Sequence, residues 1–204
     1  MPCASGGGAR LVAGASVEVE PVTSLDHTRR YGRVRAPAGD ALPGDPGPGL
    51  DAACAIVAAE SVGVAARALK LTVAYARERV QYGRPIGAFQ AVSHRCAEMY
   101  LQTEGMRSLA HAAAWAAGHD PDGLPLAAAA AKAYASQAAF RVCADALQVH
   151  GGIGFSWEHD LHFYLKRARA NAAWLGDAGE HRERVAALSP LATPSVWRAP
   201  EARA

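Results

Sequence analysis

The chain has 204 residues, of which 21 are Lys or Arg and 19 are Asp or Glu, so its formal net charge is +2. A chain of this length can bury about two-thirds of its unfolded surface, enough for one domain, or one domain with an appendage. The balance of charges, without a block of one sign, excludes the composition typical of a nucleic-acid or membrane-surface binder.

The N-terminal segment MPCASGGGARLVAG lacks the charged start and the continuous apolar region of a secretory signal. The apolar runs are short and rich in Ala, well below the roughly 20 residues of a membrane span. We therefore expect a cytoplasmic protein that does not bind membranes. The four cysteines form no C-x-x-C pair, and three of them fall within helix-like patterns, which favours free buried thiols over disulfides.

Residues 9–37 contain short alternating segments with β-branched residues, which predict two or three short strands. The Pro- and Gly-rich segment at residues 38–49 predicts a break in regular structure. Because isolated pieces of two or three strands are only marginally stable in water, we expect these strands to lie against another part of the protein.

From Leu50 onward, apolar residues recur at helical spacing. The pattern predicts one long amphipathic helix over about residues 51–80, with Asp51 as its N-cap. Pro85, between two glycines, ends this helix. Further helices are predicted over about residues 88–117, 126–150, 159–174 and 180–188.

Four of these helices are joined by short loops and carry apolar residues at heptad-like spacing. This arrangement predicts a mainly α fold, an antiparallel four-helix bundle preceded by a few short β-strands. The many alanines allow the helix axes to approach closely. Residues 189–204 follow the last helix and are predicted to form a loose C-terminal tail.

Three glycines in four positions follow the third predicted helix, in the segment QVHGGIGF. The segment is not a dinucleotide-binding loop, since that loop follows a strand, and no G-K-[ST] marks a phosphate loop. A helix C-cap explains the first glycine, Gly151. Three glycines exceed what a cap needs, and a backbone without side chains permits close approach of a flat or phosphorylated ligand.

The segment EHDLH places His159 and His162 about one helical turn apart. Zinc sites use three or four ligands and the H-E-x-x-H spacing is missing, so we interpret these residues as a solvated helix face and expect no metal. The sequence also lacks the G-x-S-x-G motif, so a Ser-His-Asp arrangement is not indicated.

The segment RVQYGRPIGAFQ places Arg79, Tyr82 and Gln90 around one tight turn, a combination suited to a pyrophosphate and a stacked ring. Its pattern is R-x-x-[FY]-G-x-x-[IL]-x-x-[FHY]-Q, and a Q-x-x-G-G-x-G segment follows at residues 148–154. Together the two motifs resemble the C-terminal helical domain of the acyl-CoA dehydrogenase family. The resemblance extends over residues 17–188, where SLDHTRRYGRV is similar to the closing strands of the family's middle β-domain.

The resemblance implies a flavoprotein scaffold, in which FAD lies between a β-domain and the helical bundle and a neighbouring subunit contacts part of the cofactor. It divides the chain into a remnant of β-domain strands and linker (1–45), the bundle (46–188) and the tail (189–204). By matched position, the resemblance implies that Arg79 faces the FAD pyrophosphate and that Tyr82 and Gln90 line the same region of the cofactor. It implies that Gln148, Gly151 and Gly152 receive the ADP end.

The reaction that the resemblance implies is α,β-dehydrogenation of an acyl-CoA thioester, in which a glutamate removes the α-proton and the hydride passes to FAD. Such a base needs a pKa near neutrality, raised by burial. One usual position of the base is occupied by Leu175, and the alternative position by Ala53, next to Cys54 where the family has an arginine. A threonine and a glutamine that often touch flavin are replaced by Asp177 and Gly179.

The catalytic residues are therefore unassigned, with Glu60, Glu158 and Asp177 as the nearby candidates for a replacement base. No counterpart of the family's N-terminal helical domain precedes Met1, so we expect a homo-oligomer or a larger acyl-CoA dehydrogenase-like partner. Three interpretations stay open: an oxidoreductase of fatty acid metabolism that acts on acyl-CoA, a non-catalytic subunit that completes the FAD site of a heteromeric enzyme, and a degenerate bundle without activity.

Overall fold

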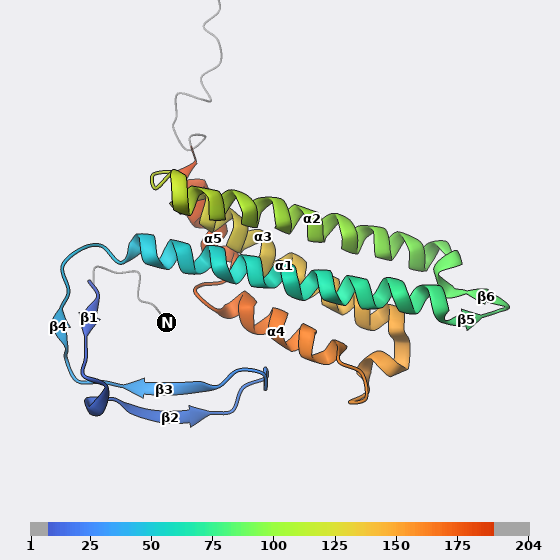
Figure 1. The fold of residues 1–204 in the computed structure, drawn as a ribbon, viewed down its shortest axis with the longest axis horizontal. Helices are drawn as coiled ribbons and strands as arrows, with labels where there is room; N and C mark the ends of the chain where they lie inside the picture. The colour runs from blue at the N-terminus through green and yellow to red at the C-terminus, as the bar shows by residue number, and fades with distance from the viewer. Residues whose placement is uncertain (1–7, 190–204) are drawn as a thin grey trace, which may run out of the picture.

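The computed structural model describes residues 8–189, in which long helices form a bundle and the N-terminal strands extend along one side of it (Figure 1). The helices of this described part are α1 (Gly47–Glu78), α2 (Gln90–His119), α3 (Leu124–His150), α4 (Leu161–Ala173) and α5 (Ala178–Leu188). Consecutive long helices run in opposite directions. The mainly α fold with a few short strands confirms the predicted fold class.

The strands form three antiparallel pairs within the described residues. The pairs are β1 (Arg10–Leu11) with β4 (Asp40–Ala41), β2 (Glu18–Val22) with β3 (Tyr31–Arg35), and β5 (Val80–Gln81) with β6 (Arg84–Pro85). β1, β2 and β3 lie where the alternating pattern predicts strands, whereas β4 falls inside the predicted break. All strand residues are exposed except Tyr31, which is partly buried, so these pairs have no core of their own.

The start of α1 differs from the sequence prediction. α1 begins at Gly47, so Asp51 lies inside the helix, where it is buried and paired with Arg184 of α5; its interpretation as the N-cap was wrong. The helix can begin within the Pro- and Gly-rich segment because a proline in the first turn has no N–H that needs an acceptor. The Gly47 N–H is also accepted by Asp45 Oδ1 at 2.8 Å.

The core is built mostly from alanine. Ala65, Ala68 and Ala139 are fully buried between α1, α2 and α3, and Met99 and Met106 of α2 fill the wider gaps. Small side chains bring the helices close, so dispersion contacts between many atoms supply the packing energy. α4 packs on α1 and α3, and α5 packs on α3.

Although the sequence contains no long run of purely apolar residues, α1 includes an 18-residue window with a mean hydropathy of 1.6. By length and composition alone, such a helix is long enough and apolar enough to cross a membrane. Core helices of water-soluble bundles have the same property, and α1 packs against α2, α3 and α4.

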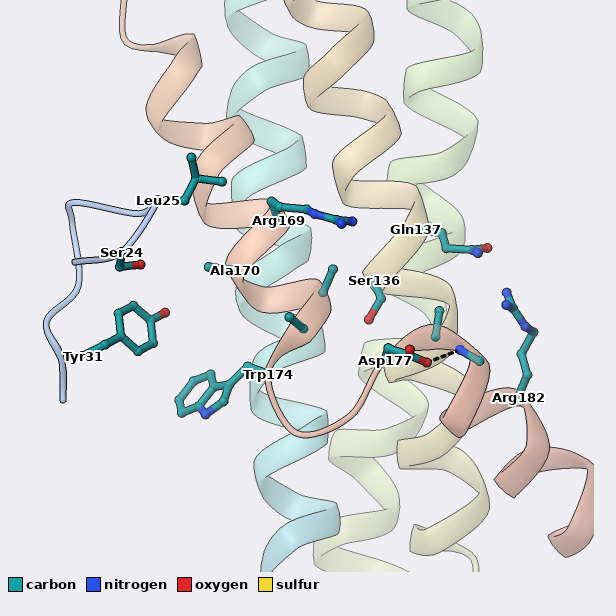
Figure 2. Close-up of a pocket in the computed structure, with 14 residues that line it drawn as sticks. Ser24, Leu25, Tyr31, Ser136, Gln137, Arg169, Ala170, Trp174, Asp177 and Arg182 are labelled. Carbon is teal, nitrogen blue, oxygen red and sulfur yellow. Dashed lines mark hydrogen bonds between the residues drawn. The ribbon is translucent and has the colours of Figure 1, made fainter. Parts of the chain in front are cut away.

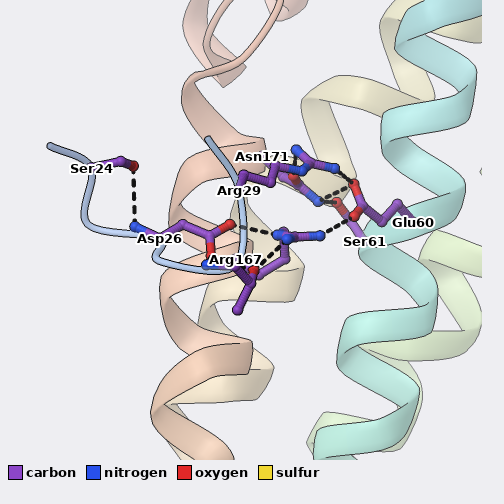
Figure 3. A network of polar contacts seen from close by, with 8 residues as sticks. Ser24, Asp26, Arg29, Glu60, Ser61, Arg167 and Asn171 are labelled. Carbon is purple, nitrogen blue, oxygen red and sulfur yellow. Dashed lines mark hydrogen bonds and ion pairs between the residues drawn. The ribbon is translucent and has the colours of Figure 1, made fainter. Parts of the chain in front are cut away.

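A network of ion pairs around the buried Asp26 joins the connection between β2 and β3 to the bundle (Figure 3). Asp26 is fully buried, and its Oδ2 accepts a hydrogen bond from Nε of Arg167 on α4 at 2.5 Å. Arg167 also donates to Glu60 of α1 at 2.6 Å, and Glu60 pairs with Arg29 and accepts from Asn171. These five residues, which we call the hairpin clamp, connect three separate parts of the chain.

The carboxyl groups of the hairpin clamp are held in the charged state. Burial by itself raises the pKa of both Asp26 and Glu60. Hydrogen bonds to Asp26 from Thr28 and Arg167, and to Glu60 from Arg167 and Arg29, outweigh this effect, so that both pKa values are lowered. The clamp therefore depends on the guanidinium groups that compensate the buried charges.

Replacing Arg167 by Ala should remove the cation that Asp26 and Glu60 share. Because Asp26 is then left buried without an ion pair, we expect the free energy of unfolding to fall by about 2–4 kcal/mol. The matched control is Arg33→Ala, whose pair with Glu20 is exposed on both sides and is worth less than about 1 kcal/mol. Urea unfolding of both variants measures the difference, and equal losses would contradict the role of the clamp.

The clamp should also open in acid. Since Asp26 and Glu60 have pKa values below their ordinary 3.8 and 4.5 in the folded chain, the unfolded chain takes up more protons as the pH falls through this range. The stabilisation is thus complete above about pH 5 and decreases below it. In a variant that keeps Trp174 as its single tryptophan, fluorescence reports the opening, because the Arg29 guanidinium lies 4.8 Å from the Trp174 ring centroid. The double variant Asp26→Asn, Glu60→Gln should lose this pH dependence.

Candidate functional site

The two sequence motifs of the expected cofactor site lie at the same end of the bundle (Figure 1). Arg79 directly follows α1, and the β5–β6 turn leads from there through a short 3-10 helix to α2. Gly151 directly follows α3. The rings of Tyr75 on α1 and His150 on α3 stack with a centroid distance of 4.4 Å, which holds these two helix ends together.

Four of the expected cofactor residues have exposed side chains. Arg79 makes no side-chain hydrogen bond or ion pair with the part of the chain that the structure describes. Tyr82 is 93% exposed and has a backbone φ of 51°, and its ring lies edge-on to that of Phe89. Gln90 begins α2, and Gln148 lies near the end of α3. Internal packing therefore leaves this end of the bundle free for another molecule.

The three positions after α3 are occupied by glycine for different structural reasons. Gly151 has a φ of 63°, a conformation that side chains disfavour. Gly154 is buried, and a Cβ there would lie 2.9 Å from the carbonyl oxygen of Leu147. A Cβ at Gly152 would meet nothing within 4 Å. Two glycines thus serve the chain's own fold, and Gly152 is the one that the fold does not explain.

The loop between α4 and α5 contains Leu175, which occupies one of the positions where the resemblance places the proton-accepting glutamate. Leu175 has a φ of 59°, and its carbonyl oxygen lies 2.8 Å from Nε2 of His181. Its side chain packs against a cluster that includes Cys54 and Ala128. The structure therefore brings Leu175 to the cluster that contains Cys54, the neighbour of Ala53, although these positions are far apart in the sequence. Burial raises the pKa of the Cys54 thiol, so none of the three provides a proton acceptor at neutral pH.

The three candidate replacement carboxylates are engaged elsewhere or distant in the fold. Glu60 belongs to the hairpin clamp, which lowers its pKa. Asp177 caps α5, where its Oδ1 accepts the N–H groups of Gly179 at 2.7 Å and Glu180 at 3.0 Å, and these bonds lower its pKa. Glu158 is exposed before the start of α4, at the opposite end of this helix from Leu175. A general base needs a raised pKa, so Glu60 and Asp177 are shifted in the wrong direction.

Sequence reasoning missed Lys132, a fully buried lysine on α3. Its ammonium group donates to Ser136 Oγ at 2.9 Å and to the carbonyl oxygens of Gly176 at 2.8 Å and Ala172 at 3.4 Å. Burial lowers its pKa. Lys132 thus fastens the end of α4 and the following loop to α3. A lysine within a run of alanines on the buried side of a helix was the available signal.

The histidines of the EHDLH segment pack against other rings. The ring of His159 lies 4.7 Å from that of His150, and the ring of His162 lies 4.6 Å from that of Trp157. Within residues 8–189, no group of three or more His, Cys, Asp or Glu side chains is arranged to hold a metal ion.

A cleft of about 830 Å³ opens beside the loop between α4 and α5 (Figure 2). Its walls come from the β2–β3 connection, α3, α4, the loop itself and the start of α5. Trp174 and Asp177 line it on the loop side, and Arg169 and Arg182 contribute cationic groups. Leu175 is not among the residues that line the cleft, and it packs instead against the cluster that includes Cys54.

Comparisons with known proteins identify similar chains. The family model for the acyl-CoA dehydrogenase C-terminal domain matches residues 49–188. Acyl-CoA dehydrogenase IpdE2 from Mycobacterium tuberculosis is 40% identical over 181 residues, which cover 89% of this chain and 52% of the relative. The chain thus spans about half the length of the curated relatives that match most of it.

Solved structures show the same similarity. The Tcur3481-Tcur3483 steroid ACAD G363A variant superimposes with a TM-score of 0.76 at 32% identity, over 85% of this chain and 48% of that one. The ChsE4-ChsE5 complex from Mycobacterium tuberculosis gives a TM-score of 0.75 at 30% identity, over 88% of this chain and 50% of that one.

Replacing Lys132 by Met should release the loop between α4 and α5. The carbonyl groups of Ala172 and Gly176 lose their donor, so we expect the free energy of unfolding to fall by about 1–3 kcal/mol. The amides of residues 174–177 should exchange hydrogen faster at the same time. Lys70→Met, at an exposed position of α1, serves as the control. Unchanged exchange in the loop would show that Lys132 does not hold it.

Proposed function

The chain belongs to the acyl-CoA dehydrogenase family, and we propose that it acts as a non-catalytic subunit that completes the FAD site of a larger acyl-CoA dehydrogenase-like chain. The observation that carries this proposal is that Leu175 packs against the cluster that contains Cys54, the sequence neighbour of Ala53. Leu175 and Ala53 occupy the two positions to which the resemblance assigns the base, and neither is a carboxylate. Glu60 and Asp177 are engaged in the clamp and the helix cap, with lowered pKa values.

The proposed contribution of this chain is to bind part of the cofactor. FAD, when bound, supplies the hydride acceptor of the reaction. Arg79 is suited to the diphosphate, because a guanidinium group binds phosphoryl oxygens in a bidentate manner. The exposed ring of Tyr82 offers a stacking surface, with Gln90 and Gln148 as amide donors nearby. The open space at Gly152, next to Gly151, fits close approach of the ADP end.

The proposed partner is an unlike chain of the same family that carries the missing glutamate. Two similar structures bear names that join two components, ChsE4-ChsE5 and Tcur3481-Tcur3483, which supports a heteromeric assembly. In such an assembly the partner holds the acyl-CoA thioester and removes its α-proton. The present chain orients the cofactor from the other side of the interface.

A catalytic role in acyl-CoA α,β-dehydrogenation is the second candidate. The cleft beside Trp174 and Asp177 favours it, since the resemblance places one usual position of the base, Leu175, in the same loop. In that case the base comes from a residue outside the usual positions. A homo-oligomer would then supply both halves of the cofactor site.

Purification of the chain alone and together with a glutamate-bearing family member distinguishes these roles. We expect the lone chain to be colourless, and the complex to show the flavin absorption band and to be bleached by an acyl-CoA. Arg79→Ala should weaken flavin retention in the complex about tenfold, the effect of losing one charge-assisted contact. Arg67→Ala, an exposed arginine of α1, should leave it unchanged.

Three outcomes would count against the subunit role. Bleaching of the lone chain by an acyl-CoA would make it a dehydrogenase in its own right. The absence of flavin from both samples would indicate a bundle that does not contact the cofactor. Equal flavin content in the Arg79→Ala and Arg67→Ala complexes would remove Arg79 from the site.

A further inference from the structure

A buried histidine stands directly before the glycine turn at residues 151–154. His150 is the last residue of α3 and is 4% exposed. The ring of Tyr75 on α1 stacks on it with an angle of 18° between the planes. The ring of His159, which precedes α4, lies 4.7 Å away at an angle of 59°. Three parts of the chain therefore meet at the His150 ring.

The glycine turn packs closely against this histidine. A Cβ at the buried Gly154 would lie 3.1 Å from the Cβ of His150, so only a glycine lets the turn come this near. At the other end of the turn, the Gly151 N–H is accepted by the carbonyl oxygens of Gln148 and Leu147 in the last turn of α3. The position of the turn thus depends on where the His150 side chain lies.

The contacts of His150 fit an uncharged ring. Its Nδ1 lies 2.8 Å from the carbonyl oxygen of Ala146, and because a carbonyl oxygen accepts, Nδ1 carries the hydrogen. The Nε2 atom is buried and has no hydrogen-bond partner within residues 8–189. Protonation would therefore bury a second N–H without an acceptor. Burial lowers the pKa of His150, the bond to Ala146 opposes this effect, and the charge of His159 adds to it.

The contacts of His159 also fit an uncharged ring. Its Nδ1 accepts the N–H of Leu161, the first residue of α4, at 3.3 Å, so this nitrogen carries no hydrogen. Protonation would remove an acceptor from the start of α4. The groups that face His150 are the phenol ring of Tyr75 from α1 and the imidazole of His159 from the segment before α4. No carboxylate of residues 8–189 acts on its charge. Two charged rings would therefore repel each other without a compensating anion.

We propose that His150 and His159, the histidine pair, are positioning residues that hold the glycine turn in place while both rings are neutral and release it in acid. The inference rests on the proposed function only in that the turn receives the ADP end of FAD, so that acid also weakens retention of the cofactor. Neither histidine is proposed to touch the cofactor.

The pH range follows from the direction of the shift. Since the pKa of His150 lies below its ordinary 6.5 in the folded chain, the released form takes up the proton more readily. The turn is therefore fully held above pH 6.5 and is released as the pH falls through the lowered pKa of His150. The carboxylates of the hairpin clamp have lowered pKa values at still more acidic pH, so the two effects occur in different ranges.

Hydrogen–deuterium exchange of the full chain at pH 7.5 and pH 5.5 tests the histidine pair. After correction for the intrinsic effect of pH on exchange, the amides of residues 151–161 should be about tenfold less protected at pH 5.5, while the centre of α3 keeps its protection. The double variant His150→Phe, His159→Asn should lose this response, because Phe keeps the stacked ring and Asn keeps the acceptor for Leu161. His111→Asn, at an exposed position of α2, is the control and should respond as the unaltered chain does.

A second measurement does not depend on any variant. The His150 ring should titrate below pH 6.5 when its carbon-bound protons are followed by NMR in the unaltered chain. Titration at or above this value overturns the proposal, and so does a pH response of residues 151–161 that persists in the double variant.

Flavin retention in the complex with a glutamate-bearing family member separates this proposal from the proposed function. We expect the unaltered complex to lose flavin about tenfold more readily at pH 5.5 than at pH 7.5, and the double variant to show no such difference. Release of the turn without a change in flavin retention would leave the histidine pair standing and remove the turn from the cofactor site. A complex without flavin at either pH would count against the proposed function alone, since hydrogen exchange decides the role of the pair.

Discussion

Buried charged groups need partners of opposite charge or hydrogen-bonding groups. This requirement fixes the positions of the shorter elements that the alanine core does not hold in place. Alanines pack α1, α2 and α3 closely but provide few distinctive contacts for the shorter elements around them. Three buried ions provide these contacts instead. Asp26 holds the β2–β3 connection to α4, Asp51 holds α5 to α1, and Lys132 holds the loop after α4 to α3. Each ion would be costly without its partner, so each contact has essentially one geometry.

The same requirement decides the chemistry that the chain can perform. Lys132 and His181 both bind carbonyl groups of the loop between α4 and α5, in which Leu175 packs against the cluster that contains Cys54. Of the acidic groups that the sequence offers as substitutes, Glu60 and Asp177 already accept hydrogen bonds that favour their charged forms. A carboxylate stabilised in this way is a poor proton acceptor at neutral pH.

The sequence predicted the helices well because their period is a local property, whereas the long-range ion pairs were invisible to it. Asp51 has the residue type and position of an N-cap, and its true partner, Arg184, is 133 residues away. Glu60 looked available as a base for the same reason, since its partners come from the β2–β3 connection and from α4. Lys132 was hidden in a run of alanines. The turn residues Arg79 and Gly151, by contrast, were found from motifs that are contiguous in sequence.

Residues that the internal packing does not explain are the ones on which the proposed cofactor contact rests. Gly151 and Gly154 have internal reasons to be glycine, so their presence says little about a ligand, while Gly152 has no such reason. The arginines divide in the same way. Arg167 is fixed by the buried carboxylates that it compensates, while Arg79 is free to meet an anion from outside. An arginine without an internal partner, next to a glycine-rich turn, is therefore stronger evidence of a binding site than an arginine that is already paired with buried carboxylates.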